Sequence, residues 1–312
     1  YTDVINSNRP GASISAFSVG TNVIQFEAGP YILNEDHALL DREDRSFGLD
    51  FTGRYGLLWE QLELTLQGTF QSTKRSFTGT VDNEETFSNF KTLHFGAKYL
   101  VYDPYKKAEE EKPNLYSWNA NHKFRWKYLI PAVSVYAGVN YDTTDNPFTA
   151  NGVEGISPRV MVATQNTFTN GWVFVMNLIM DRIGTDQSDF QYLLTLTKSI
   201  NQHWVVFGET QGINSDFYAD NLVRFGGAYL WNPNFQLDTA LTLNTKDTPS
   251  VFGVTFGASY RLDFHQDPEV DNGTELGDGG KKRKKKKKDK DVERSARKAE
   301  KGRQKQEVDF DD

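Results

Sequence analysis

The fold is decided by a stretch near the end of the chain that reads Phe252-Gly253-Val254-Thr255-Phe256-Gly257-Ala258-Ser259-Tyr260-Arg261-Leu262-Asp263-Phe264. Apolar and aromatic residues occupy every second position, and Gly, Thr, Ser, Arg and Asp stand between them. Successive side chains of a β-strand point to opposite faces. A period of two held for this long therefore predicts a strand with one apolar and one polar face.

The same period recurs along the chain as far as residue 264, and helical periodicity is absent from this part. About twelve segments show it, each roughly ten residues long. Soluble strands are typically about half that length, whereas about 9–11 residues cross a bilayer as a tilted strand. Short links alternate with longer polar ones. We expect strands near residues 21–33, 45–56, 59–72, 89–102, 132–142, 157–167, 171–182, 190–200, 203–213, 221–231, 235–245 and 250–264.

These features predict an all-β protein, a twelve-stranded antiparallel transmembrane β-barrel with both termini periplasmic. A soluble β-sandwich is the competing fold, because its strands alternate too. Two features favour the barrel. The second face is polar, where a sandwich would need an apolar core, and aromatic residues gather at segment ends, as in the interfacial girdles of membrane barrels. The expected girdle contains Tyr31, Trp59, Tyr99, Tyr141, Trp172, Trp204, Tyr229, Trp231 and Phe264.

Composition narrows the class of protein further. The 312 residues include no Cys, which excludes a disulfide scaffold, a thiolate metal site and a thiol nucleophile. Apolar runs are far shorter than the ~20 residues of a transmembrane helix. The chain opens on Tyr1, as expected of a processed, exported protein. We therefore expect a location in the outer membrane of a Gram-negative-type bacterium, in contact with outer-membrane lipid and lipopolysaccharide.

Three parts are expected along the chain. Residues 1–20 form an N-terminal periplasmic lead-in, 21–264 the barrel, and 265–312 a charged periplasmic tail. One link on the periplasmic side, 103–131, is unusually long. It is either a solvated insertion anchored at the interface by Trp118, Phe124 and Trp126, or a docking element for a partner.

The tail carries a dense basic run although the whole chain has a net charge of −7. Such a run repels itself and attracts polyanions or acidic partners. We expect it to bind protein partners or peptidoglycan, and not nucleic acid, because aromatic residues are not interleaved with the basic ones. A disordered solvated tail is the alternative. The predicted binding residues are Lys281, Lys282, Arg283, Lys284, Lys285, Lys286, Lys287 and Lys288.

The polar face of the strands predicts a lumen lined by charges of both signs. A twelve-stranded barrel lies between the eight-stranded barrels filled by side chains and the open 16–18-stranded porins. The lumen is therefore either a small polar conduit or a plugged interior in which ion pairs serve stability. Its candidate residues are Asp50, Arg54, Glu63, Lys98, Arg159, Asp181, Glu209, Arg224, Asp238 and Arg261, with Asp263 at the end of the last strand.

Several short motifs occur in the order found in one family. The chain reads Arg9-Pro10-Gly11 near its start, and Gln25-Phe26-Glu27-Ala28-Gly29 in the first expected strand. Ser157-Pro158-Arg159, Phe207-Gly208-Glu209 and Asn232-Pro233-Asn234 follow. This order resembles the outer-membrane channel family associated with meta-pathway phenol degradation, over roughly residues 5–264. The 103–131 link, the basic tail and Ser15-Ala16-Phe17, which lacks the family's proline, depart from it. The resemblance implies a transporter-like outer-membrane barrel and specifies no substrate.

We predict a transporter-like channel for small solutes, without cofactor, metal or catalytic residues. The alternative is a non-conducting barrel subunit of a secretion or barrel-insertion complex, which docks partners or cell wall through the 103–131 link and the tail. Catalysis by a barrel hydrolase would need a His base beside a nucleophilic Ser, and none of the five His is expected there. Acidic residues between Glu35 and Asp44 lack the spacing of a calcium loop.

Overall fold

A computed structural model of the chain describes residues 4–77, 83–105, 129–216 and 218–265. These residues form twelve strands and two short 3₁₀ turns, η1 (Ala38–Leu40) and η3 (Thr169–Gly171). The strands are β1 (Val23–His37), β2 (Arg42–Gly56), β3 (Leu62–Phe77), β4 (Glu84–Tyr102), β5 (Ala132–Asp142), β6 (Gly155–Phe168), β7 (Trp172–Asp181), β8 (Asp189–Ser199), β9 (Trp204–Ser215), β10 (Ala219–Asn232), β11 (Phe235–Asn244) and β12 (Ser250–Asp263).

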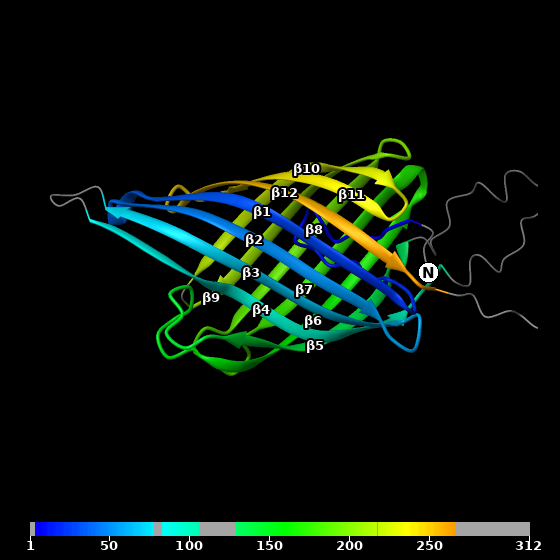
Figure 1. The fold of residues 1–312 in the computed structure, drawn as a ribbon, viewed down its shortest axis with the longest axis horizontal. Helices are drawn as coiled ribbons and strands as arrows, with labels where there is room; N and C mark the ends of the chain where they lie inside the picture. The colour runs from blue at the N-terminus through cyan, green and yellow to red at the C-terminus, as the bar shows by residue number, and fades with distance from the viewer. Residues whose placement is uncertain (1–3, 78–82, 106–128, 217, 266–312) are drawn as a thin grey trace, which may run out of the picture. The chain divides into compact units, whose positions relative to one another are not determined.

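The twelve strands close into one barrel. Each strand pairs antiparallel with its neighbours in sequence, and β1 also pairs with β12 (Figure 1). Closure gives every strand two partners and leaves no sheet edge. A bilayer offers backbone groups no hydrogen bonds, so a closed barrel is one of the two structures that can span it. The predicted all-β, twelve-stranded barrel is confirmed, with every expected segment present as a strand.

Strands β1 to β4 are longer than the sequence predicts. They have 15, 15, 16 and 19 residues, whereas β5 to β12 have 10 to 14. At the ends joined by the β1–β2 and β3–β4 links, charged residues replace the hydrophobic alternation, but backbone pairing continues there. The longer strands β1 to β4 can be followed in Figure 1. Outward ion pairs between Arg45 and Glu43 and between Lys74 and Glu84 accompany this extension.

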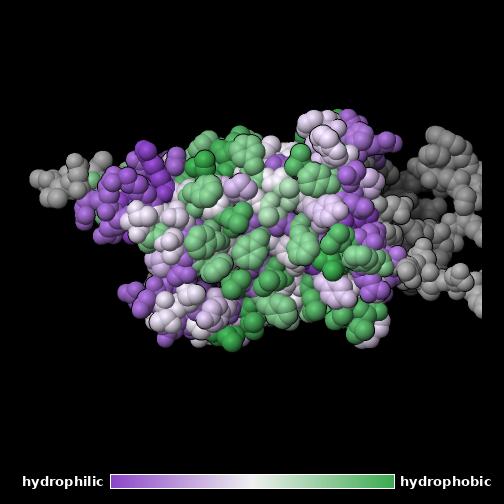
Figure 2. Space-filling model, viewed as in Figure 1, coloured by the Kyte–Doolittle hydropathy of each residue, from purple (hydrophilic) through white to green (hydrophobic). Residues whose placement is uncertain are grey.

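The outer surface of the barrel is apolar. Figure 2 shows hydrophobic side chains over the middle of the wall and hydrophilic ones toward its ends. Outward residues such as Phe26, Phe47 and Phe256 are 54–60% exposed, which suits contact with lipid. Tyr31 is an exception to the expected girdle. It shares the inner face of β1 with Gln25 and Glu27, and its hydroxyl donates to Gln71 Oε1 at 2.7 Å.

Two ends of the barrel differ in their connections. The turn end holds the start of β1, the end of β12, the short links after β2, β6, β8 and β10, and the junction of β4 with the long link to β5; the loop end holds the links after β1, β3, β5, β7, β9 and β11. Most of the 103–131 link, residues 106–128, and the basic tail from 266 lie outside the described residues. Within the described residues, no helix has the length and apolarity needed to cross a membrane.

Candidate functional site in the barrel lumen

Charged side chains line the inside of the wall. The structure places all ten candidate lumen residues on inward-facing positions of their strands, and eight of them are at most 9% exposed. The two that are less buried are Asp50 and Arg224. Burial of so many charges requires partners, and the partners identify which of these residues act together.

The N-terminal segment occupies the lumen. We call residues 5–19 the plug, because they run inside the wall before β1 begins (Figure 1). Ile5, Ala16 and Val19 of the plug are at most 7% exposed. The sequence predicts a periplasmic lead-in at residues 1–20, whereas in the structure residues 5–19 lie inside the barrel. Residues 5–19 mix small polar residues such as Ser13 and Ser15 with apolar ones such as Ile14 and Phe17, and this mixture does not specify the surface on which they pack.

Four buried charges on β1 to β4 form a closed cluster. Arg54 Nη2 lies 2.9 Å from Glu63 Oε2, and Arg54 Nη1 lies 3.3 Å from Glu27 Oε1. Lys98 Nζ lies 3.1 Å from Glu63 Oε1. These four side chains are at most 2% exposed, and their two positive and two negative charges balance. We call them the β1–β4 charge cluster.

This cluster binds backbone groups of the plug. Lys98 Nζ donates to the carbonyl oxygens of Ser15 and Phe17, at 2.8 and 3.0 Å. Glu63 Oε2 accepts from the Val19 amide at 2.9 Å. Charge-assisted hydrogen bonds of this kind are about twice as strong as neutral ones. The β1–β4 charge cluster therefore binds residues 15–19 of the plug through their main chain.

Glu209, on the opposite wall, also binds the plug backbone. Its carboxylate accepts from the amides of Ala12 and Ser13, at 3.0 to 3.1 Å. It also accepts from the Thr195 hydroxyl at 2.7 Å and from Arg224 at 3.0 Å. One carboxylate from β9 thus receives donors from the plug and from both neighbouring strands.

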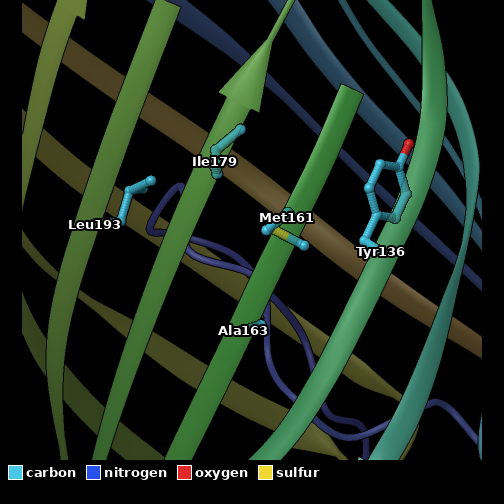
Figure 3. Packing of buried hydrophobic residues seen from close by; sticks show 5 residues of the cluster. All are labelled: Tyr136, Met161, Ala163, Ile179 and Leu193. Carbon is cyan, nitrogen blue, oxygen red and sulfur yellow. The ribbon is translucent and has the colours of Figure 1, made fainter. Parts of the chain in front are cut away.

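Asn177 and a small apolar cluster hold the middle of the plug. The Asn177 side chain accepts from the Ile14 amide at 2.6 Å and donates to the Ile14 carbonyl at 2.8 Å. The Ile14 side chain packs on inward-facing apolar residues of β5 to β8. These residues are Tyr136, Met161, Ala163, Ile179 and Leu193 (Figure 3).

Four candidate lumen residues serve the wall in other ways. Arg159 and Asp181 form an ion pair. Arg261 Nε donates to Asn234 at 2.8 Å, and Asp50 accepts from Thr69 at 2.6 Å. The remaining candidate, Asp238, pairs with plug residue Arg9 at 3.2 Å.

Several plug-binding residues were missed from the sequence, among them Glu27 and Asn177. Glu27 and Asn177 lie on the polar faces of their strands, where alternation alone would place them in the lumen. Nothing in the alternation distinguishes a wall residue that touches the plug from one that does not. The described residues contain no group of three His, Cys, Asp or Glu side chains suited to a metal ion.

A cavity of about 190 Å³ lies between the plug and the wall. On the plug side it is lined by residues 5–11, Ser13 and Ser15. On the wall side it meets inward-facing residues of β6 to β11 in the half of the barrel nearer the turn end. Several of these are apolar, namely Val173, Val175, Val205, Phe207 and Ala228.

The family of the chain is shown by its sequence. Residues 7–262 match the model of the family described as "Putative MetA-pathway of phenol degradation". The chain belongs to this family. The match covers the plug as well as the barrel, so the lumen segment is part of the shared domain. A search of curated proteins finds no match.

Solved structures resemble the barrel at low identity. An outer membrane channel from Pseudomonas putida F1 is 10% identical, with 83% of this chain and 100% of that chain covered and a TM-score of 0.49. The TodX monoaromatic hydrocarbon channel is 11% identical, with 80% and 92% covered and a TM-score of 0.47. The NanC porin is 8% identical, with 75% and 100% covered and a TM-score of 0.45.

The protein is an outer-membrane β-barrel of this family. Family membership, the closed twelve-stranded wall and its apolar exterior agree on this point. The alternative, a non-conducting subunit of a larger assembly, is not favoured.

Proposed function

We propose that the protein is a channel for small, mainly apolar solutes, in which the plug narrows the lumen to a passage along the β7–β10 wall. The cavity between the plug and this wall carries the proposal. The β1–β4 side is closed by ion pairs and hydrogen bonds to the plug. The opposite side retains free volume.

The size and lining of the cavity support this class of solute. An apolar cavity of about 150 Å³ is large enough to bind benzene, and this one measures about 190 Å³. Aliphatic side chains such as Val175 and Val205 face it from the wall, and plug residues such as Ser7 and Ser13 face it from the other side. A small neutral molecule with an apolar body and one polar group matches both sides.

We also propose that the protein has no catalytic activity. In the described part of the chain, His94 contacts Asn140, and His37 contacts Arg42. Neither contact places a His base against a Ser hydroxyl, which a barrel hydrolase of the kind considered above would need.

The basic residues 281–288 are proposed to bind peptidoglycan or an acidic protein partner. Their charge supports this proposal, since a long-range attraction needs no packed surface. Lipid and lipopolysaccharide are the proposed surroundings of the apolar wall, on which residues such as Phe95 and Leu196 are exposed.

Conductance and solute uptake test the channel. The purified protein is inserted into planar bilayers and into liposomes, as wild type and with residues 5–18 deleted. We expect small stepwise currents from the wild type and larger ones after the deletion, because a twelve-stranded wall without its plug encloses more open space. Arg54→Ala and Glu209→Ala should shift the currents in the same direction. A wild-type barrel that is electrically silent, admits no small solute and co-purifies with fixed partners would support the non-conducting subunit instead.

A further inference from the structure

The junction between the first and last strands is interrupted near its middle. Residue pairs between β1 and β12 run from Val23↔Asp263 to Ala28↔Ala258 and resume at Tyr31↔Thr255, in the same register. The skipped positions on β1 are Gly29 and Pro30. Proline has no N–H to donate, so it cannot complete a ladder hydrogen bond at this point.

Arg9 of the plug lies on this interruption. Its Nη2 donates to the carbonyl oxygen of Phe256 on β12 at 3.2 Å, and Phe256 is the residue in register with Pro30. The same guanidinium pairs with Asp238 on β11, whose side chain is fully buried. A planar guanidinium can bond several acceptors at once in a fixed geometry. Pro30 supplies no N–H donor to β12, and the Arg9 guanidinium supplies a charged donor at this point.

Two glycines make room for the Arg9 side chain. Gly29 and Gly257 face the lumen on adjacent strands. A Cβ on either residue would lie 2.2 Å from Arg9 Nη2, which is too close for any contact. The guanidinium therefore rests directly on the backbone of both strands, and any side chain at these positions would push it away.

The two plug residues before Arg9 also span the junction. Ser7 Oγ is hydrogen-bonded to Ser259 Oγ of β12 at 2.7 Å, and Glu27 Oε1 of β1 accepts from the Asn8 amide at 3.3 Å. Glu27 and Ser259 are direct partners across the junction. Three consecutive plug residues therefore bond to β12, β1 and β12 in turn.

We infer that residues 7–9 are a clasp that holds β1 and β12 together, with Arg9 supplying the hydrogen-bond donor that Pro30 lacks. The plug is then part of the wall's closure as well as an obstacle in its lumen. Removing the plug weakens one strand junction and leaves the other eleven as they are. This inference concerns the wall and holds whether or not the lumen conducts.

Hydrogen exchange of the full chain in detergent or lipid nanodiscs tests the clasp. We expect Arg9→Ala to accelerate exchange of amides around 31–33 in β1 and 254–258 in β12 by about tenfold, the equivalent of one lost charge-assisted hydrogen bond. Amides of the β6–β7 pair should exchange as in the wild type. Arg9→Lys should be intermediate, because an ammonium keeps the charge for Asp238 but lacks the planar fork. Millimolar methylguanidinium should slow the exchange of Arg9→Ala again, and potassium should not.

Glu209→Gln is the matched control, since it loosens the plug at the opposite wall without touching Arg9. It should leave the β1–β12 amides unchanged. Gly257→Ala is the second variant in case Arg9→Ala does not fold. It retains Arg9 but displaces the guanidinium, and it should give the same local acceleration. The clasp is refuted if the junction exchanges at the wild-type rate in Arg9→Ala or Gly257→Ala, or if Glu209→Gln loosens it equally.

Discussion

The two walls of the lumen hold the plug in different ways. On β1 to β4, fully buried charges of opposite sign meet each other and the plug backbone, with Lys98 and Glu63 at 0% exposure. On β7 to β10, Asn177 and Glu209 bind the plug backbone, and the cavity beside the plug is lined on the wall side largely by apolar side chains such as Val175 and Val205. The comparison separates two tasks. One wall fixes where the plug lies, and the other leaves the volume through which a solute can pass.

The largest effect is expected from breaking the fixed wall. Arg54→Met leaves Glu27 and Glu63 with Lys98 as their remaining cation inside the β1–β4 charge cluster. An uncompensated buried charge typically costs about 3–5 kcal/mol of stability. The measurement is the urea dependence of the compact, heat-modifiable band on a gel.

Arg45→Met on the outer face is the control for that variant. Its side chain is 67% exposed and pairs with Glu43, and exposed ion pairs contribute about 1 kcal/mol or less. Equal losses in the two variants would show that the buried cluster is no more important to the fold than a surface pair.

A smaller effect is expected from the grip on the opposite wall. Glu209→Gln removes the charge that Arg224 faces and turns an amide group toward the plug's own amides. Hydrogen bonds to charged groups are worth about 1.5–3 kcal/mol, so the part of the plug around Ala12 to Ala16 should leave the wall at least about tenfold more often, while residues 7–9 stay bound at the β1–β12 junction. The chain has no native Cys, and a maleimide therefore reports on Ala16→Cys, a plug position with 0% exposure.

The matched control is Asp50→Asn, since Asp50 faces the lumen but accepts from Thr69 on the wall. Labelling of Ala16→Cys should keep its original rate in that background. If Asp50→Asn accelerated labelling as much as Glu209→Gln, the plug would respond to lumen charge in general and not to its direct partners.

Filling the cavity should act on passage more than on stability. Ala228→Phe places a ring in the space beside the plug, and overpacking of this kind costs about 1–3 kcal/mol. We expect uptake of small apolar solutes into liposomes to fall, while Ala16→Cys stays protected. Ala137→Phe, at an exposed lipid-facing position of β5, should leave uptake unchanged. Uptake that survives the filled cavity would place the passage elsewhere.

The wall could be predicted from the sequence because the period of two in a strand distinguishes the residues that face lipid from those that face the lumen. The alternation in Phe252 to Phe264 and in the other segments predicts the number of strands. It also predicts that charged side chains such as those of Arg54 and Glu209 face the lumen. The alternation fails where both faces are apolar, as on β7, where inward Val173 and Val175 follow the same pattern as outward Phe174. It also says nothing about segments outside strands. Much of the plug is bound through its backbone, which every sequence has in common, so these contacts cannot be predicted from its residues. The plug side chains that do bind the wall, such as those of Ser7 and Arg9, show no periodicity that would reveal their partners.

The smallest effect on the barrel is expected from changes in the C-terminal tail, which contributes no strand to either wall. Deleting residues 270–312 removes the run of basic residues from Lys281 to Lys288 and no residue of β1 to β12. Strand pairing and lipid contact hold the barrel, so insertion, heat-modifiability and protection of Ala16→Cys should all persist. Association with peptidoglycan or an acidic partner should weaken, and it should fall steeply with salt in the intact chain because screened attraction carries it. Replacing Lys284 to Lys288 by Gln should reproduce most of that loss, since charge and not a packed surface is responsible. A truncated barrel that fails to insert would assign the tail to biogenesis, and one that keeps every partner at moderate salt would make it a solvated tail without a binding role.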